Sequence, residues 1–407
     1  MQILFLQLLS PLSKFLEQES EQVDSQSGSR TFAYSDFVKN LIYGTSTKIE
    51  SFRKLVLDLS SNPNVEKLGL KPVAFSTFKD GFSRFNYLYI NKLYTFLLSQ
   101  IDFQQVPDLK NLGLFKLVDG SLFPTLCSVE WASYKKHKKA IRLHLSFCLN
   151  SLLPSEFLIA KGNSCERSFL KSIVEFAHTY IADRGYFSFD LANFIDNSRA
   201  YFIFRLKENF IFENILSLDI DSGEALMPLC FNQIRDEIVF FVNDPYKKIY
   251  RIVRFTVLTS HFTICTNRFD LNTLQIIMLY AYRWQIELFF KFIKRTLNGI
   301  HLFSTSENGA QIHFLIVLIT ALLQIKLKQD CIRKMSACNT QNGQKKDSLT
   351  AKIDVQQYSG INPSKWIESI AEIFQSGFKI SSDWILYFKN FIAQVVDYQI
   401  IIKLAVT

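Results

Sequence analysis

The chain has 407 residues, of which 48% are apolar, enough to build two or three domains with sizeable cores. Its net charge of +9 and pI near 9.0 favour an anionic partner, nucleic acid first, although an ordinary basic protein can have the same balance. Seven cysteines without any Cys-x-x-Cys pair exclude a paired-cysteine zinc site and indicate free thiols in a reducing cytoplasm.

The N-terminal hundred residues have the pattern of a helical region. Residues 1–20 are apolar but lack a basic n-region and a small-residue cleavage site, which favours an amphipathic helix over a signal peptide. Further helices are expected at 49–59, 65–70 and 76–88.

Local signals predict how two of these helices begin. Thr47 and Glu50 have the spacing of a capping box, and Ser76 is placed to cap the later helix. Short helices joined by tight turns, the last carrying Lys79 and Arg84, are typical of a helix-turn-helix DNA reader. A plain helical bundle with solvated charges is the alternative.

From about residue 112 the pattern changes to alternating strands and helices, which predicts an α/β core. Strands are expected at 113–123, 140–150, 178–183 and 200–209, with helices at 165–177 and 190–197. Asp119 is expected to end the first strand, and Asp183 to end the strand that begins at residue 178.

The second half is predicted to be β-rich first and helical afterwards. Several short strands are expected within 208–268, followed by one long helix over 272–297. The apolar run at 310–327 is shorter than the roughly 20 residues of a membrane span, so a buried core helix is expected and no membrane contact. Residues 328–352 resemble a basic linker or exposed loop, and 353–407 a helical tail.

Polar residues recur along one side of the predicted helix over 272–297. Tyr280, Arg283, Glu287 and Lys294 are spaced to share one stripe, and Lys291 lies beside them. A carboxylate between cations suits metal and phosphate chemistry, and the cations are of the kind that hold DNA phosphates. A solvated helix face has the same composition.

Three acids are candidates for a common metal site. Asp119 and Asp183 each close a predicted strand, and ligand sites in α/β sheets gather beyond the carboxyl ends of strands, where Glu287 could join them. Gly120 and Gly185 would allow close approach of the backbone to a ligand. Crowded carboxylates repel each other unless a cation is bound, and hard oxygen ligands favour Mg²⁺ or Mn²⁺. Each Asp taken alone is equally typical of a strand end.

At these residues the chain resembles the DDE transposases of the insertion sequence four family, which are bacterial cut-and-paste elements. The family signature is Tyr, two residues, Arg, three residues, Glu, six residues and Lys, and residues 280–294 match it without a gap. The other similar segments are LFKLVDGSLFP (114–124), 131–145, TYIADRGYFSF (179–189), YFIFRLK (201–207) and, before the core, parts of 31–85. The resemblance spans about 30–325.

The resemblance implies a ribonuclease H-like catalytic core with a β-rich insertion, preceded by a helical DNA-binding domain. The interval from Asp183 to Glu287 is much longer than that from Asp119 to Asp183, as an insertion requires. The expected division is a helical DNA-binding domain at 1–105, the first part of the core at 106–207, the insertion at 208–268, the second part of the core at 269–327, and a basic linker with a helical tail at 328–407.

The resemblance also implies the chemistry. Asp119, Asp183 and Glu287 would be catalytic and would bind two Mg²⁺ ions, for which Mn²⁺ can substitute. DNA phosphates would be contacted by Tyr280, Arg283, Lys294, Lys291, Arg205 and Lys207 in the core, and DNA would also be read by Lys79 and Arg84.

The implied substrate is double-stranded DNA. A homodimer in the bacterial cytoplasm, associated with the nucleoid, would bind terminal inverted repeats through residues 1–105. Water would cut at the element end, and the freed 3′-hydroxyl would attack target DNA.

Two alternatives stay open: a DNA-binding protein whose catalysis has lapsed, and a nuclease of the same fold that only hydrolyses. Relatives with a hairpin intermediate hold a flipped base on an aromatic ring, for which Tyr246 or Tyr250 is the candidate here, a structural tyrosine being the alternative.

Overall fold

The computed structural model describes residues 2–27, 32–101, 109, 111–126, 129–136, 138–220, 231–257, 260–295, 297, 299 and 301–341. Within them the chain forms two compact units. Unit 1 takes its residues from Met1–Asp102, Phe123–Ala140 and Phe290–Ala371, and unit 2 from Phe103–Leu122 and Ile141–Phe289. The expected helical tail at 353–407 lies outside the described residues, and the predicted domain boundaries stay predictions.

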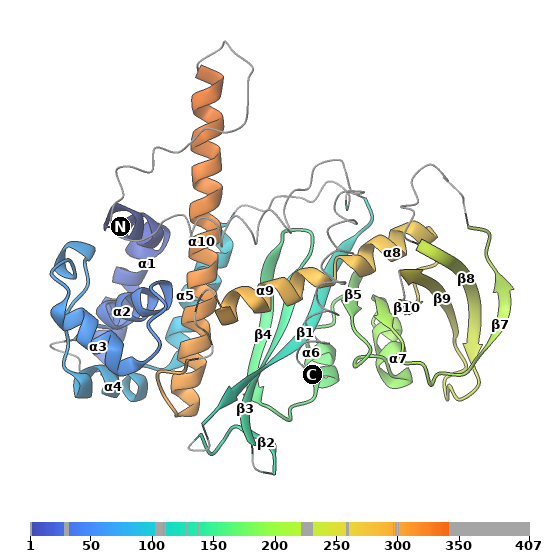
Figure 1. Ribbon diagram of the computed structural model, residues 1–407, viewed down its shortest axis with the longest axis horizontal. Coiled ribbons are helices and arrows are strands. Elements are labelled where there is room, and N and C mark those ends of the chain that lie inside the picture. The colour runs from blue at the N-terminus through green and yellow to red at the C-terminus, as the bar shows by residue number, and fades with distance from the viewer. Residues whose placement is uncertain are drawn as a thin grey trace. The chain divides into compact units, whose positions relative to one another are not determined.

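Unit 1 is mainly helical, as predicted for its N-terminal part. Its helices are α1 (Gln2–Ser27), α2 (Tyr34–Ser46), α3 (Phe52–Ser61), the short 3₁₀ helix η1 (Glu66–Leu68), α4 (Phe75–Arg84), α5 (Tyr87–Gln100) and α10 (Glu307–Gln341) (Figure 1). Helix α10 packs against α1, α2, α4 and α5, so the apolar C-terminal helix completes the core of the N-terminal bundle.

The predicted start of α3 was wrong by one turn. Ser51 is its N-cap, and the Ser51 hydroxyl accepts a hydrogen bond from Lys54 N at 3.2 Å. Thr47 cannot form the expected capping box with Glu50, because its hydroxyl already donates to Tyr43 O at 2.7 Å and closes α2. A side chain that satisfies the end of one helix is no longer free to cap the next.

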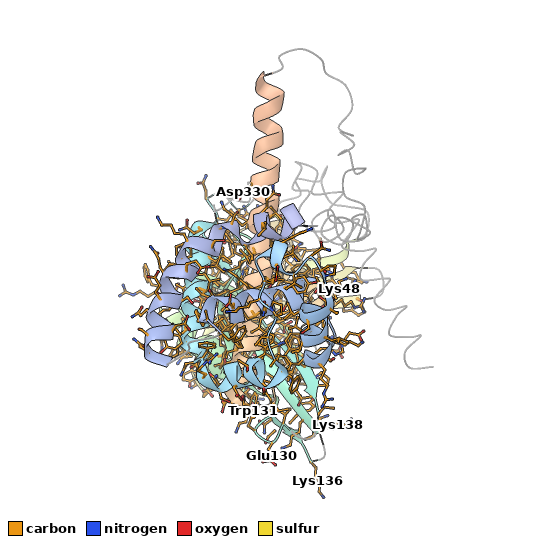
Figure 2. All side chains as sticks on the ribbon, turned by 90° about the vertical axis from the view of Figure 1, so that its left-hand side faces the viewer. Lys48, Glu130, Trp131, Lys136, Lys138 and Asp330 are labelled. Atoms are coloured by element: carbon orange, nitrogen blue, oxygen red, sulfur yellow. The ribbon has the colours of Figure 1, made fainter. Side chains whose placement is uncertain are left out.

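Helix α10 is longer than predicted. Residues 328–341 are helical, so the expected linker was wrong over that part, and 342–352 lie outside the described residues. Asp330, labelled in Figure 2, forms an ion pair with Lys326, which lies one turn earlier on α10; the distance from Lys326 Nζ to Asp330 Oδ1 is 3.2 Å. Among the described residues, Glu307–Leu327 is the one stretch long and apolar enough to cross a membrane, and 83% of its apolar window is buried, which fits a core helix.

Unit 2 is built on a mixed sheet, so the α/β expectation was right at this level. The strands are β1 (Leu114–Thr125), β3 (Lys138–Cys148), β4 (Leu153–Lys161), β5 (His178–Ala182), β6 (Tyr201–Arg205), β7 (Phe212–Ser217), β8 (Phe231–Phe241), β9 (Ile249–Val257) and β10 (Ser260–Thr266). In unit 1, β2 (Ser133–Lys135) pairs with the first residues of β3.

The sheet order is β3-β1-β5-β6-β10-β9-β8-β7, with β4 on the other side of β3 (Figure 1). Strands β1, β5 and β6 are mutually parallel, and β10, β9, β8 and β7 continue the sheet antiparallel from β6. The β texture predicted for 208–268 is therefore present, and its strands extend the sheet that carries the two aspartates.

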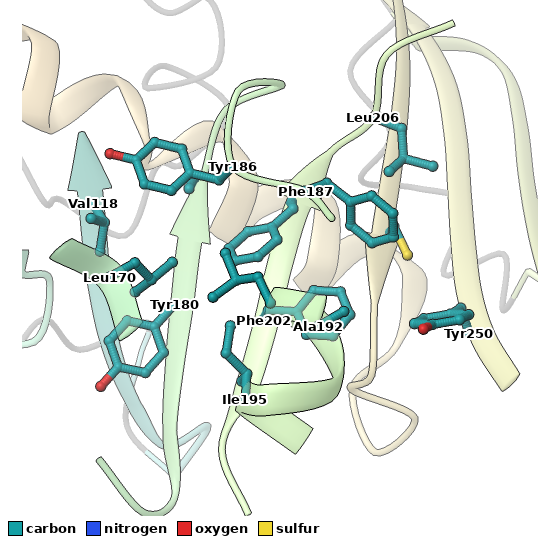
Figure 3. Packing of buried hydrophobic residues seen from close by; sticks show 14 of the residues in the cluster. Val118, Leu170, Tyr180, Tyr186, Phe187, Ala192, Ile195, Phe202, Leu206 and Tyr250 are labelled. Carbon is teal, nitrogen blue, oxygen red and sulfur yellow. The ribbon is translucent and has the colours of Figure 1, made fainter. Parts of the chain in front are cut away.

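Helices α6 (Glu166–Ser172) and α7 (Phe189–Asn197) occupy the connections around β5 and bury its face. Their apolar side chains, Leu170 from α6 and Ile195 from α7, pack with Val118, Tyr180 and Phe202 from β1, β5 and β6 (Figure 3). All five are at most 1% exposed, so the strands that carry Asp119 and lead to Asp183 rest on a tightly packed base.

The predicted single helix over 272–297 was wrong, because it is interrupted. Helix α8 (Thr273–Ala281) ends before Tyr282 and α9 (Trp284–Arg295) begins after Arg283. Here Arg283 N bonds to Tyr280 O at 3.1 Å and Gln285 N to Tyr282 O at 2.9 Å, so the backbone tightens to three-residue turns. The break removes the single stripe on which the four signature residues were expected.

Candidate active site

Asp119 and Asp183 lie side by side on neighbouring parallel strands. The strand register pairs Leu117 with Ile181, and Asp119 and Asp183 each lie two residues further along. In-register positions of parallel strands project to the same face. Asp119 was expected at a strand end, and this was wrong, because β1 continues to Thr125; Asp183 does follow the last residue of β5, as expected.

Each aspartate is fixed by the glycine expected to serve it. Asp119 Oδ1 accepts from Gly120 N at 2.7 Å, and Asp183 Oδ1 accepts from Gly185 N at 2.9 Å. These backbone bonds orient one oxygen of each carboxylate and leave the other available.

The electrostatics bring Glu287 into the same neighbourhood. Burial raises the pKa of Asp119 to about 7, against the opposing effects of the Arg283 guanidinium and the Gly120 N–H, and the charges of Asp183 and Glu287 raise it further. The charges of the other two predicted acids therefore act on Asp119. Like charges at this range disfavour the fully ionised set unless a cation joins it.

Glu287 is paired with the arginine one turn before it. Arg283 Nη1 donates to Glu287 Oε1 at 2.5 Å. Burial lowers the pKa of Arg283, but the neighbouring Tyr280 and Glu287 raise it more, so the net shift is upward. The Tyr280 ring is buried and lies 5.7 Å from the guanidinium.

Carboxylate oxygens are the ligands that Mg²⁺ and Mn²⁺ prefer, so the chemistry of the donor set fits such ions. Among the described residues, however, no three His, Cys, Asp or Glu side chains stand close enough together to hold a metal ion. The Arg283–Glu287 ion pair occupies one of the expected ligands. To join a metal site with the two aspartates, Glu287 would have to leave this ion pair.

Two predicted DNA contacts follow β6. The β5–β6 register places Arg205 next to Asp183, extending the row of charged residues across three strands. Arg205 Nη2 donates to His261 O at 3.0 Å, and burial lowers its pKa. Lys207 is exposed and lines a cavity together with aromatic residues, among them Phe187.

The two lysines after Glu287 are carried by α9. Lys291 lies one turn and Lys294 two turns further along the helix, within unit 1. Lys291 is exposed, whereas Lys294 Nζ lies 4.7 Å from the centre of the Phe123 ring.

The two N-terminal candidates differ in exposure. Lys79 is exposed on α4, but Arg84 Nη2 donates to Phe32 O at 3.2 Å and so helps to hold the bundle together. Ser76 does not cap α4, contrary to the prediction, because the helix already begins at Phe75. Lys136 and Lys138, at the β2–β3 turn, add further basic residues to unit 1 (Figure 2).

The two tyrosines considered for base stacking have structural contacts. Tyr250 is 2% exposed and its hydroxyl donates to Asp244 Oδ2 at 3.0 Å, so its ring faces cannot receive a base. Tyr246 is exposed, and its hydroxyl donates to Asp190 Oδ1 at 2.6 Å.

A fourth acid, absent from the sequence-based candidates, lies beside Asp183. Glu166 opens α6, and Arg142 on β3 forms an ion pair with it. Burial raises the pKa of Glu166, Arg142 lowers it, and the charge of Asp183 raises it again, giving a net upward shift. The available sequence signal was an acid in the first turn of a helix that leads into the Asp183 strand.

The chain is similar to known transposases. Residues 112–323 match the family model described as Transposase DDE domain. A protein named as the probable transposase for insertion sequence element IS5377 of Geobacillus stearothermophilus is 21% identical over 71% of this chain and 75% of its own length. A Sinorhizobium fredii protein provisionally named as transposase y4zB is 26% identical over 52% of this chain and 61% of its own. Because the family model covers more than half of the chain, the protein belongs to the Transposase DDE domain family.

Proposed function

We propose that this protein is an Mg²⁺-dependent DNA transposase of the insertion sequence four type with a ribonuclease H-like core. Asp119, Asp183 and Glu287 would hold two divalent cations, and Mn²⁺ would substitute for Mg²⁺. The observation that carries the proposal is the adjacency of Asp119 and Asp183 on parallel strands, with Glu287 close enough to raise the pKa of Asp119. The parallel strands β1, β5 and β6, connected through α6 and α7, support the core assignment.

When bound, the cations would stabilise the charge that develops on the attacking and leaving oxygens during phosphodiester displacement. Glu287 would exchange its bond to Arg283 for this site, which frees the guanidinium for a DNA phosphate. The Gly120 and Gly185 N–H groups would keep the two aspartates oriented during this exchange.

The basic residues would position DNA. Arg205, next to Asp183, and the exposed Lys207 would hold phosphates near the cleaved end, as would Lys291 and Lys294 on α9. Tyr280 would act through Arg283, since its ring is buried beside that guanidinium. Residues 1–105, with Lys79 and Arg84, would bind the terminal inverted repeats, and the protein would act on DNA as a homodimer in the cytoplasm near the nucleoid.

The test is Mg²⁺-dependent cleavage of a duplex that carries the terminal repeat, taken from the DNA that borders the gene. Asp119→Asn, Asp183→Asn and Glu287→Gln should each abolish cleavage and leave repeat binding in a gel shift intact. Glu213→Gln, an exposed acid on β7, is the matched control and should cleave normally.

The same assay separates the alternatives. Strand-transfer products into a second duplex distinguish a transposase from a nuclease that only hydrolyses. Repeat binding without any cleavage in Mg²⁺ or Mn²⁺ by the wild-type chain would indicate a lapsed DNA-binding protein and refute the proposal.

A further inference from the structure

Glu166, the acid that the sequence patterns missed, is held in one orientation by Arg142. Arg142 Nη1 pairs with Glu166 Oε1, and Arg142 Nε donates to Gly162 O at 3.1 Å. The Arg142 side chain is 16% exposed and that of Glu166 is 26% exposed. The guanidinium therefore engages one carboxylate oxygen and fixes the direction of the other.

The second oxygen of Glu166 points to the Asp183 turn. A Cβ added at Gly185 would lie 3.2 Å from Asp183 Oδ1 and 3.3 Å from Glu166 Oε2. The two acids thus face the same small space, which a side chain at position 185 would fill. Oxygens of two carboxylates so placed repel each other, and a shared divalent cation would reverse the sign of that interaction.

One nitrogen of a buried histidine, near Gly120 and Glu166 Oε1, also lacks a partner. The ring of His144 is 0% exposed, and its Nε2 lies 2.7 Å from Ser164 Oγ. Its Nδ1 has no hydrogen-bond partner among the described residues and lies 3.2 Å from where a Cβ of Gly120 would stand, as does Glu166 Oε1. A buried ring nitrogen without a partner is unfavourable, and a water on a bound cation would satisfy it.

We propose that Glu166 is a further ligand of the metal centre: Glu166 Oε2 and Asp183 share one divalent cation, Arg142 holds Glu166 Oε1, and His144 Nδ1 bonds to a water of that ion. This inference rests on the metal centre of the proposed function. It adds an acid outside the Asp119, Asp183 and Glu287 set and assigns a purpose to the Arg142 ion pair.

The experiment is titration of the full chain with Mn²⁺ in the absence of DNA, with free Mn²⁺ measured by electron paramagnetic resonance. Glu166→Gln should raise the Mn²⁺ dissociation constant about tenfold, the size of effect expected when a ligand or its support is lost. Arg142→Gln should weaken Mn²⁺ binding less than Glu166→Gln does, because it keeps the charged carboxylate and removes only the group that orients it.

The matched control is another arginine–glutamate ion pair, Arg254 on β9 with Glu237 on β8. Glu237→Gln should leave the Mn²⁺ dissociation constant unchanged. If Glu166→Gln alone folds poorly, the double variant with Arg142→Gln removes both charges together, and it should show the same tenfold weakening.

A purely structural role gives a different result. Equal losses of thermal stability in Glu166→Gln and Arg142→Gln, with wild-type Mn²⁺ affinity in both, would overturn the inference while Asp183→Asn still abolished binding. Wild-type affinity in Asp183→Asn, or no Mn²⁺ binding by the wild-type chain, would instead refute the metal centre on which the inference rests.

Discussion

Two acids in the sheet of unit 2, the buried Asp236 and the half-buried Asp119, have opposite surroundings. On β8, Asp236 is bonded by Arg251 through both oxygens, at 2.9 Å from Nε and 2.6 Å from Nη2, and Thr273 adds a third bond. On β1, Asp119 accepts the N–H of Gly120, and burial raises its pKa to about 7. A carboxylate that is ion-paired within the protein stabilises the fold. A carboxylate without such an ion pair is available to bind an external cation.

The largest effect is expected where a matched pair is broken. Arg251→Met leaves Asp236 buried without its guanidinium, which should lower the free energy of unfolding by about 3–5 kcal/mol. Chemical denaturation followed by circular dichroism measures it. A loss below about 1 kcal/mol would show that Asp236 is not held by this pair, and the contrast with Asp119 would disappear.

A titratable group can also be buried without an ion-pair partner if it stays uncharged, as His313 of α10 does. Burial lowers the pKa of His313 to about 4, so above pH 6.5 it is uncharged in both folded and unfolded chains. As pH falls from 6.5 to 4 the unfolded chain takes up the proton first, and about 3 kcal/mol of stability should be lost. In His313→Gln that part of the pH dependence should vanish, whereas the exposed His261→Gln should keep it; identical profiles for wild type and His313→Gln would contradict the assignment.

Removing the charge of Asp119 should increase the stability of the protein, in contrast to the loss expected for Arg251→Met. Asp119→Asn removes a buried charge that Asp183 and Glu287 repel, so the free energy of unfolding in EDTA should rise by about 0.5–2 kcal/mol. The measurement is thermal unfolding with and without Mg²⁺. Destabilisation of the Asn variant in EDTA would mean that Asp119 is already matched by the protein.

The smallest effect concerns the helical unit, where polar contacts are local. Ser51→Ala removes the N-cap of α3 and should lower stability by about 1 kcal/mol, whereas Thr47→Ala, at the rejected cap position, should not disturb the start of α3. Hydrogen exchange of the Lys54 amide separates the two. Equal protection of this amide in both variants would contradict the revised cap.

Strands and helices of unit 2 were predictable because each keeps its own apolar period and is bounded by polar turns. The break between α8 and α9 was not, since apolar residues continue through Tyr282 and no Pro or Gly marks it. The place of Asp119 inside β1 was also missed, because polar Asp119 and Gly120 interrupt the strand pattern without ending the pairing.

The candidate acids were predictable only as separate residues. What the strand pattern could not supply was register, which puts Asp119 beside Asp183 and Arg205 on the other side of Asp183. Glu166 was missed for a related reason: its relation to Asp183 comes from how α6 returns to the sheet, and no spacing along the chain encodes it.

The most direct test of the metal centre replaces each proposed ligand with cysteine and compares repeat-end cleavage in Mg²⁺ and Mn²⁺. A thiolate is a poor ligand for Mg²⁺ and a better one for softer ions. Asp119→Cys, Asp183→Cys and Glu287→Cys should all lose cleavage in Mg²⁺, and cleavage should return in Mn²⁺ for at least one of them. Undiminished Mg²⁺-dependent cleavage by any of the three would contradict the shared metal centre.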